Sequence, residues 1–347
     1  MRNLDGGWET YVDDVLDFAL DRLRAGERVA LVTLVMVDGS SPRPPGAQMV
    51  VSETGQWVGY LSGGCLERAV VAEALAAIEE GSNRRVRYGR GSKYFDIQLP
   101  CGSAIELIFD VQVSQRELEA VLARLNQRQP ACLRVSDEKT ARGDNLPVVR
   151  RYLPRRRLIV AGVGPAAVLL GRLGIEVGYE VVLYSPDGPT RRALERSGVV
   201  TVAIRSAAGA YVFDADPWTA IVFMFHDHVW ERDLIPAALA TSAFYIGAMG
   251  SKNAHRVRLK MLEEMGLHPD EFSRIKGPCG LFASAKSAQS IAISILAEIL
   301  QLDHSAAHES LEMDDASLLA GAIDHFEALP AHSHCSLGNK EKCLGGH

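Results

Sequence analysis

The spacing of apolar residues in the first 125 positions changes several times along the chain. Apolar residues recur every three or four positions over 12–24, which is the spacing of an amphipathic helix. A nearly continuous β-rich run over 29–37 then predicts a strand, because Asp38-Gly39 ends it with turn residues. The same criteria predict a hairpin over 48–51 and 56–61, helices over 66–78 and 115–125, and a strand over 105–113.

After position 157 the chain alternates short apolar strands with helices. Strands are predicted over 158–161, 180–184, 199–203, 220–225 and 244–246, with helices over 168–177, 190–196 and 229–239. Such alternation is typical of βαβ units, so the second half is predicted to be a Rossmann-like, doubly wound parallel sheet. The fold class is therefore α/β, with an N-terminal α+β domain.

The polar segment 136–145 separates these two patterns. We expect an N-terminal domain over 1–150, a Rossmann-like domain over 151–302 and a C-terminal extension over 303–347. The end of that extension carries His, Cys, Ser and Gly without apolar periodicity and is predicted to be a flexible tail.

Composition narrows the class of protein. The 347 residues are 47% hydrophobic and carry a net charge of -6, which argues against a nucleic-acid binder. The start has no apolar signal region and no apolar stretch is long enough for a membrane span, so a cytoplasmic protein is expected. Its six cysteines are then expected to act as thiols, ligands or nucleophiles rather than in disulfides.

Two cysteines lie in glycine-rich frames. Cys65 follows Gly63 and Gly64, and Cys101 precedes Gly102. Glycines beside a thiol let backbone N–H groups and the sulfur approach a ligand together, so these five residues are candidate cofactor-binding positions. Cys65 also comes at the predicted start of a helix, where the dipole would attract an anion and acidify the thiol. Both cysteines could instead be buried apolar residues, as free cysteines often are.

The second half carries a G-x-G-x-x-A turn between a strand and a helix. Gly162 and Gly164 would let a pyrophosphate approach, and Asp187 after the next strand is a candidate for binding a ribose hydroxyl. Pro165 removes one N–H from the turn, so at most weak nucleotide binding is predicted.

Three further segments have two interpretations each. The arginine-rich run 84–93 fits either a phosphate site or a charged strand edge. The segment 225–228 carries two histidines at a strand end and fits either acid–base chemistry or a polar loop. The segment 250–260 fits either an anion site or a basic, solvated helix face.

Several ordered blocks resemble one known family, the xanthine dehydrogenase accessory (XdhC/CoxI) proteins. The blocks of the first half lie at 39–46, 58–67 and 96–102, and those that resemble the family's Rossmann domain lie at 245–252, 277–281 and 291–298. Together they extend the resemblance over about residues 12–300.

The resemblance implies a maturation factor more than a turnover enzyme. Family members bind molybdenum cofactor (molybdopterin), protect it while its sulfido ligand is installed, and deliver it to a xanthine dehydrogenase-type hydroxylase. It implies a hydroxylase client, a cysteine desulfurase as sulfur donor, a homodimer, and cofactor contacts from Ser40, Arg43 and both framed cysteines. The residue types suit a polyanion with a soft, sulfur-bound metal.

Two other functions stay open at this stage. An NAD(P)-dependent oxidoreductase would use only the second domain and would leave the first without a role. An interaction adaptor without a ligand would leave the glycine–cysteine frames without a role.

Overall fold

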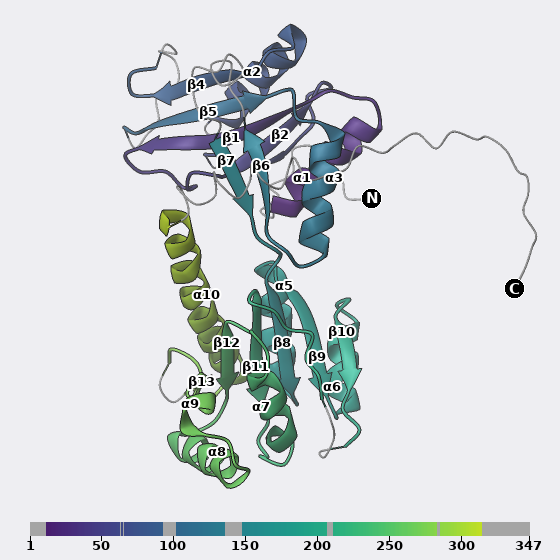
Figure 1. The fold of residues 1–347 in the computed structure, drawn as a ribbon, viewed down its shortest axis with the longest axis vertical. Helices are drawn as coiled ribbons and strands as arrows, with labels where there is room; N and C mark the ends of the chain where they lie inside the picture. Colours follow the sequence, from purple (N-terminus) through teal and green to yellow (C-terminus); the bar gives the residue numbers. More distant parts are fainter. Residues whose placement is uncertain are drawn as a thin grey trace, which may run out of the picture. The chain divides into compact units, whose positions relative to one another are not determined.

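The computed structural model describes residues 12–62, 64, 66–92, 102–135, 148–206, 211–282 and 285–313. Two large sheets, each with its own helices, account for most of these residues (Figure 1). The mixed α/β class predicted from the hydrophobic pattern is confirmed.

The first sheet is antiparallel, with the strand order β3-β2-β1-β5-β4. Its strands are β1 (Val29–Asp38), β2 (Gln48–Ser52), β3 (Trp57–Gly59), β4 (Arg84–Gly89) and β5 (Ala104–Asp110). The helices of this domain are α1 (Val12–Arg24), α2 (Glu67–Glu80) and α3 (Gln115–Asn126).

Helices cover both faces of this sheet, which explains the continuous apolar run of its central strand. Ala30, Val32 and Leu34 of β1 pack in a cluster with residues of α2. Val29 and Leu31 point to the other face and pack with residues of α1 and α3. Because successive side chains of a strand face opposite ways, both sets must be apolar for β1 to be buried on each side.

A two-stranded ribbon that the sequence pattern did not predict follows α3. Its strands β6 (Ala131–Val135) and β7 (Val148–Tyr152) are antiparallel. The Tyr152 hydroxyl donates to Gln48 Oε1 of β2 at 2.7 Å, and Gln48 Nε2 donates to Thr33 Oγ1 of β1 at 2.9 Å. The chain therefore stays with the first domain two residues beyond position 150.

The second sheet is parallel, with the order β10-β9-β8-β11-β12-β13. Its strands are β8 (Arg157–Gly162), β9 (Glu180–Ser185), β10 (Val200–Ala203), β11 (Thr219–Met224), β12 (Tyr245–Ala248) and β13 (Ile275–Lys276). The helices are α5 (Pro165–Glu176), α6 (Gly188–Glu195), α7 (Glu231–Leu239), α8 (Lys252–Glu264), α9 (Pro269–Phe272) and α10 (Ala288–Met313).

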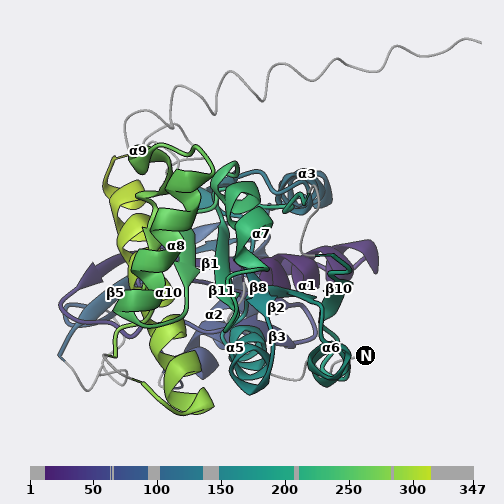
Figure 2. The ribbon, with the colours of Figure 1, turned by 90° about the horizontal axis from the view of Figure 1, so that it is seen from below.

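Helices lie on both faces of the parallel sheet as well. α5, α6 and α10 pack on one face and α7 and α8 on the other (Figure 2). This is the doubly wound arrangement that the alternating pattern predicted.

The last helix extends farther than the predicted domain end at 302. α10 continues to Met313, and the histidine- and cysteine-containing tail lies outside the described residues. No helix in the described ranges has the length and apolar character of a membrane span.

Candidate functional site

The loop over 39–46 follows the central strand β1 and leads into β2. Its far end is tied back to β1, because the Gly46 N–H donates to the Leu34 carbonyl at 2.7 Å and the Leu34 N–H donates to the Ala47 carbonyl at 2.9 Å. The 39–46 loop is thus held at the end of a buried strand, a position from which its polar groups can be presented to a ligand.

One side of the 39–46 loop contacts the segment that follows Cys101. The Ser40 N–H donates to Ser103 Oγ at 3.0 Å. Gly39 has φ +98°, and a Cβ there would lie 2.8 Å from Ser103 Oγ, so this close approach requires glycine. Cys101 itself lies outside the described residues, and Gly102 is exposed.

The other side of the loop contacts the residue that precedes the Cys65 turn. The guanidinium of Arg43 lies over the Tyr60 ring, 4.4 Å from its centroid. Within the described part of the chain, Arg43 has no carboxylate partner. Gly63 and Cys65 are outside the described residues, but the structure brings the flanks of both cysteine frames to one loop.

The turn at 62–66 is organised by the carboxylate of Glu67, a contact that the sequence analysis missed. The buried Glu67 accepts from the N–H groups of Ser62 (2.9 Å), Gly64 (2.8 Å) and Leu66 (3.2 Å) and from the Ser62 hydroxyl (2.9 Å). Burial opposes ionisation of Glu67, but the hydrogen bonds from Ser62 and Leu61 outweigh it and hold its pKa below the ordinary value. An acid that directly follows a glycine-rich turn was the available signal.

The described N–H donors at the start of α2 already have an acceptor within the chain. Leu66 is the N-cap, and the donors of the turn already bind the Glu67 carboxylate. A second negative charge at the same donors would be repelled, so the described geometry gives no support to acidification of Cys65 by this helix end.

Arginines of strand β4 and of the turn after it form ion pairs with carboxylates. Arg87 contacts Asp38 at 2.8 Å and Glu106 at 3.1 Å, and Arg90 contacts Asp38 at 2.9 Å. Arg84 likewise pairs with Glu73 at 2.7 Å. The charged strand edge is therefore the interpretation that the structure favours over a phosphate site.

The glycine turn of the second domain is hydrogen-bonded to side chains at the start of α6. The Gly164 N–H donates to Thr190 Oγ1 at 2.9 Å, and Thr190 in turn donates to Asp187 through its N–H at 2.8 Å and its hydroxyl at 2.5 Å. Asp187 is thus the N-cap of α6, and the hydrogen bonds from Thr190 lower its pKa. Beside the turn lies a mainly apolar cavity of about 450 Å³.

The histidine segment after β11 leads into a buried ion pair. His228 Nδ1 lies 2.6 Å from Glu231 Oε2, and Arg258 of α8 binds both Glu231 oxygens at 2.9 and 2.8 Å. Arg258 also donates to the Met249 carbonyl at 2.9 Å. With Arg258 only 1% exposed, the prediction of a solvated basic face is wrong at this residue.

A partly buried thiol, that of Cys279, lies in the Rossmann-like domain. Burial, with a smaller effect from the Glu298 carboxylate, raises the pKa of Cys279 to about 12. Glu298 itself accepts from the Tyr245 hydroxyl and from the Gly280 N–H. Cys279 is therefore a neutral thiol with little nucleophilic character at neutral pH.

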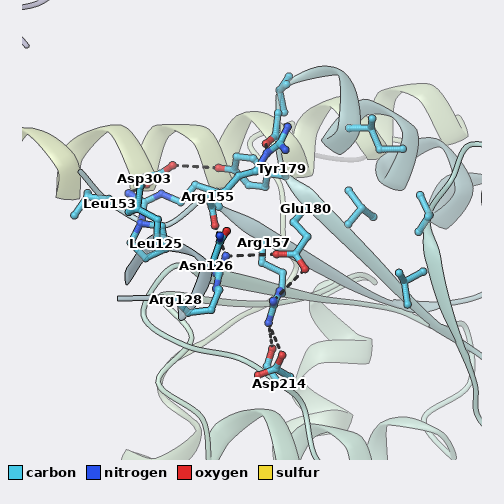
Figure 3. Close-up of a pocket in the computed structure, with 18 of the residues that line it drawn as sticks. Leu125, Asn126, Arg128, Leu153, Arg155, Arg157, Tyr179, Glu180, Asp214 and Asp303 are labelled. Atoms are coloured by element: carbon cyan, nitrogen blue, oxygen red, sulfur yellow. Dashed lines mark hydrogen bonds and ion pairs between the residues drawn. The ribbon is translucent and has the colours of Figure 1, made fainter. Parts of the chain in front are cut away.

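A cavity of about 1030 Å³ lies where β8 and β9 begin (Figure 3). Two of its arginines already hold carboxylates: Arg157 binds Glu180 at 3.0 Å and Asp214 at 2.8 Å, and Arg128 contacts Glu180 at 3.4 Å. Size alone does not make it a ligand site, because these two cations are already paired within the chain. Across the described residues, no group of three or more His, Cys, Asp or Glu side chains is placed to hold a metal ion.

Two family models match the chain. One described as the XdhC Rossmann domain matches residues 158–299, and one described as the XdhC and CoxI family matches residues 22–89. The second match contains the 39–46 loop, Tyr60 and the Cys65 turn.

Individual proteins are similar over most of the chain. A protein named molybdenum cofactor insertion chaperone PaoD, from Escherichia coli, is 35% identical over 82% of this chain and 86% of its own length. A probable xanthine dehydrogenase subunit from Bacillus subtilis is 26% identical over 85% of this chain and 97% of its own length. A solved structure titled as a xanthine dehydrogenase from Bacillus halodurans has the same fold, with a TM-score of 0.67 at 23% identity over 87% of this chain and 97% of that one.

Proposed function

We propose that this chain, which belongs to the XdhC and CoxI family, binds molybdenum cofactor in its first domain and passes it to a molybdenum hydroxylase. Support comes from the family matches and from the similarity to a protein named as a molybdenum cofactor insertion chaperone. The observation that carries the proposal is that one loop, 39–46, contacts Ser103 on one side and Tyr60 on the other, next to both cysteine frames.

The chemistry of the described residues fits such a cargo. Molybdenum cofactor is a polyanion whose metal is soft and bound by sulfur, so a binder needs cations and hydrogen-bond donors for the anion and thiols for the metal end. Among the described residues no carboxylate pairs with the cation of Arg43, and its Nε is buried there without a hydrogen-bond partner. We assign Ser40, Arg43, Gly63, Gly64 and Gly102 to the cofactor-binding surface.

Cys65 and Cys101 are proposed to contact the metal or to protect its sulfido ligand. Either role keeps oxygen and bulk thiols away from a labile sulfur while a sulfur donor, proposed to be a cysteine desulfurase, acts on the cofactor. A homodimer that delivers the sulfurated cofactor to a xanthine dehydrogenase-type client completes the proposed role.

The second domain is proposed to take no tightly bound nucleotide. Gly164, Thr190 and Asp187 hydrogen-bond to one another, and Pro165 has no N–H to offer a phosphate. This closed turn weighs against an NAD(P)-dependent oxidoreductase, the main alternative.

The test is cofactor content after anaerobic purification from a host that makes molybdenum cofactor. The full chain should carry molybdenum together with the fluorescence of oxidised pterin. Cys65→Ala and Cys101→Ala should lose most of both, whereas Cys279→Ala, which removes a thiol of the second domain, should keep them. Retention in both first-domain variants at the parental level, with full activation of a hydroxylase, would refute the cysteine site.

A further inference from the structure

Arg150, a residue to which the sequence analysis gave no role, packs against the end of the 39–46 loop. Gly46 has φ +90°, and a Cβ there would lie 3.1 Å from Arg150 Nε, so the glycine leaves the space that the guanidinium fills. The same guanidinium lies 5.2 Å from the centroid of the Tyr152 ring. Tyr152 is itself fixed to Gln48 by a 2.7 Å hydrogen bond, so Arg150 is held on a rigid strand.

Arg43 and Arg150 share a deficit of partners. The Nε atoms of both are buried and bind nothing, and neither arginine has a carboxylate partner among the residues described. The side-chain hydrogen bond of Arg150 goes to the carbonyl of Arg151. By contrast, Arg87 on β4 of the same domain contacts two carboxylates, those of Asp38 and Glu106.

The charges of the two arginines also act on each other. Burial lowers the pKa of Arg150, and the positive charge of Arg43 lowers it further. Among the described residues these two partly buried cations have no carboxylate counter-charge, and a bound anion would lower the energy of both. The planar guanidinium suits phosphate oxygens in particular, because its N–H groups can bind them in pairs.

We propose that Arg43 and Arg150 form a phosphate subsite at the end of the 39–46 loop. The inference rests on the proposed function, and it assigns this subsite to the phosphate of the cofactor, which leaves the cysteine frames for the metal end. Tyr60 and Tyr152 contact the two guanidinium groups with their ring faces, and the absence of a side chain at Gly46 leaves room for Arg150 beside the 39–46 loop.

The subsite is tested with inorganic pyrophosphate and inorganic phosphate, titrated calorimetrically into the cofactor-free full chain in a buffer without other polyvalent anions. Arg43→Gln and Arg150→Gln should each weaken pyrophosphate binding about 10- to 100-fold, the effect of losing a charged hydrogen bond. Arg90→Gln is the matched control, because Arg90 already pairs with Asp38, and it should change the affinity less than about twofold. Far-ultraviolet circular dichroism checks that each variant is folded. If Arg150→Gln is not folded, the result for Arg43→Gln alone decides the outcome.

Cofactor retention, measured separately on the same variants, distinguishes the two proposals. Pyrophosphate binding that depends on both arginines in a chain that never holds cofactor would keep the subsite and refute the proposed function. Cofactor retention with equal pyrophosphate affinity in the parent, Arg43→Gln and Arg90→Gln would keep the proposed function and overturn the subsite. Absence of pyrophosphate binding to the parent at millimolar concentration would also overturn it.

Discussion

Each domain places a loop that contains glycines after a central strand of its sheet, β1 in the first and β8 in the second, and the two loops differ in what their polar groups bind. In the second domain the Gly164 N–H, Thr190 and Asp187 satisfy one another. At the 39–46 loop, Arg43 and the neighbouring Arg150 keep buried Nε atoms without partners.

This difference shows that glycine spacing identifies a loop that a ligand could approach. Whether a ligand would stabilise that loop depends on which of its polar groups lack hydrogen-bond or charge partners within the chain. A donor that already has an acceptor within the chain gains little free energy from a ligand, because binding only exchanges one hydrogen bond for another. For a buried cation without an acceptor, a bound anion offsets the desolvation cost of burying the charge. The first domain is therefore the better candidate, although the second carries the more familiar motif.

The largest expected effect comes from breaking the internal pairing of the second domain. Glu231→Gln leaves the Arg258 guanidinium buried without its charge partner, so the free energy of unfolding should fall by about 3–5 kcal/mol. Urea denaturation measures this change in the free energy of unfolding. Glu264→Gln, which removes an exposed partner of Lys260, should cost less than about 1 kcal/mol. A loss below 1 kcal/mol for Glu231→Gln would mean that the pair does not hold the domain together.

A smaller effect is expected from the Glu67 carboxylate in the first domain. Glu67→Gln should lower the free energy of unfolding by about 1.5–3 kcal/mol at pH 7, because charged hydrogen bonds to the 62–66 turn are lost. Glu79→Gln, on the exposed face of α2, is the control and should be nearly neutral.

The same variant has a defined pH dependence. The pKa of Glu67 is lowered from its ordinary value of 4.5, so its stabilisation is complete above that value and is lost as the pH falls through the lower folded-state pKa. The stability difference between the parent and Glu67→Gln should therefore shrink below about pH 4.5. A difference that grows on acidification would contradict the assigned role.

Much of the fold was predictable from local pattern. Most strands of both sheets and several of their helices follow from apolar spacing because each of these elements buries a face, as the alternation along β1 shows. The β6–β7 ribbon was missed, since Val148–Tyr152 includes two arginines and reads as polar. Its placement depends on long-range contacts such as the hydrogen bond between Tyr152 and Gln48, residues 104 positions apart.

Less of the candidate site was predictable, because the residue that pairs with a given charged side chain can be far away in the sequence. Arg43 stood out in its loop, but nothing local distinguishes it from Arg87, whose partner Asp38 is 49 positions away. The arginine-rich run fitted either a phosphate site or a charged strand edge until its carboxylates were located. Arg150 gave no signal, because its proximity to Gly46 exists only after β7 packs beside the 39–46 loop.

The smallest expected effect is nucleotide binding to the second domain. Calorimetric titration of the full chain with nicotinamide, flavin and adenine nucleotides should give dissociation constants weaker than about 1 μM, or no measurable heat. A submicromolar constant for any of them would show that the bonds among Gly164, Thr190 and Asp187 open for a ligand, and would restore the oxidoreductase interpretation.

Hydrogen–deuterium exchange of the cofactor-loaded and cofactor-free full chain, read by mass spectrometry, tests the central claim most directly because it reports on both domains at once. The predicted result is slower exchange on loading in peptides that cover the 39–46 loop, Tyr60 and the turn up to Glu67, with no change over 162–190. Protection confined to 162–190, with unchanged exchange at the 39–46 loop, would contradict the assignment of the cofactor to the first domain.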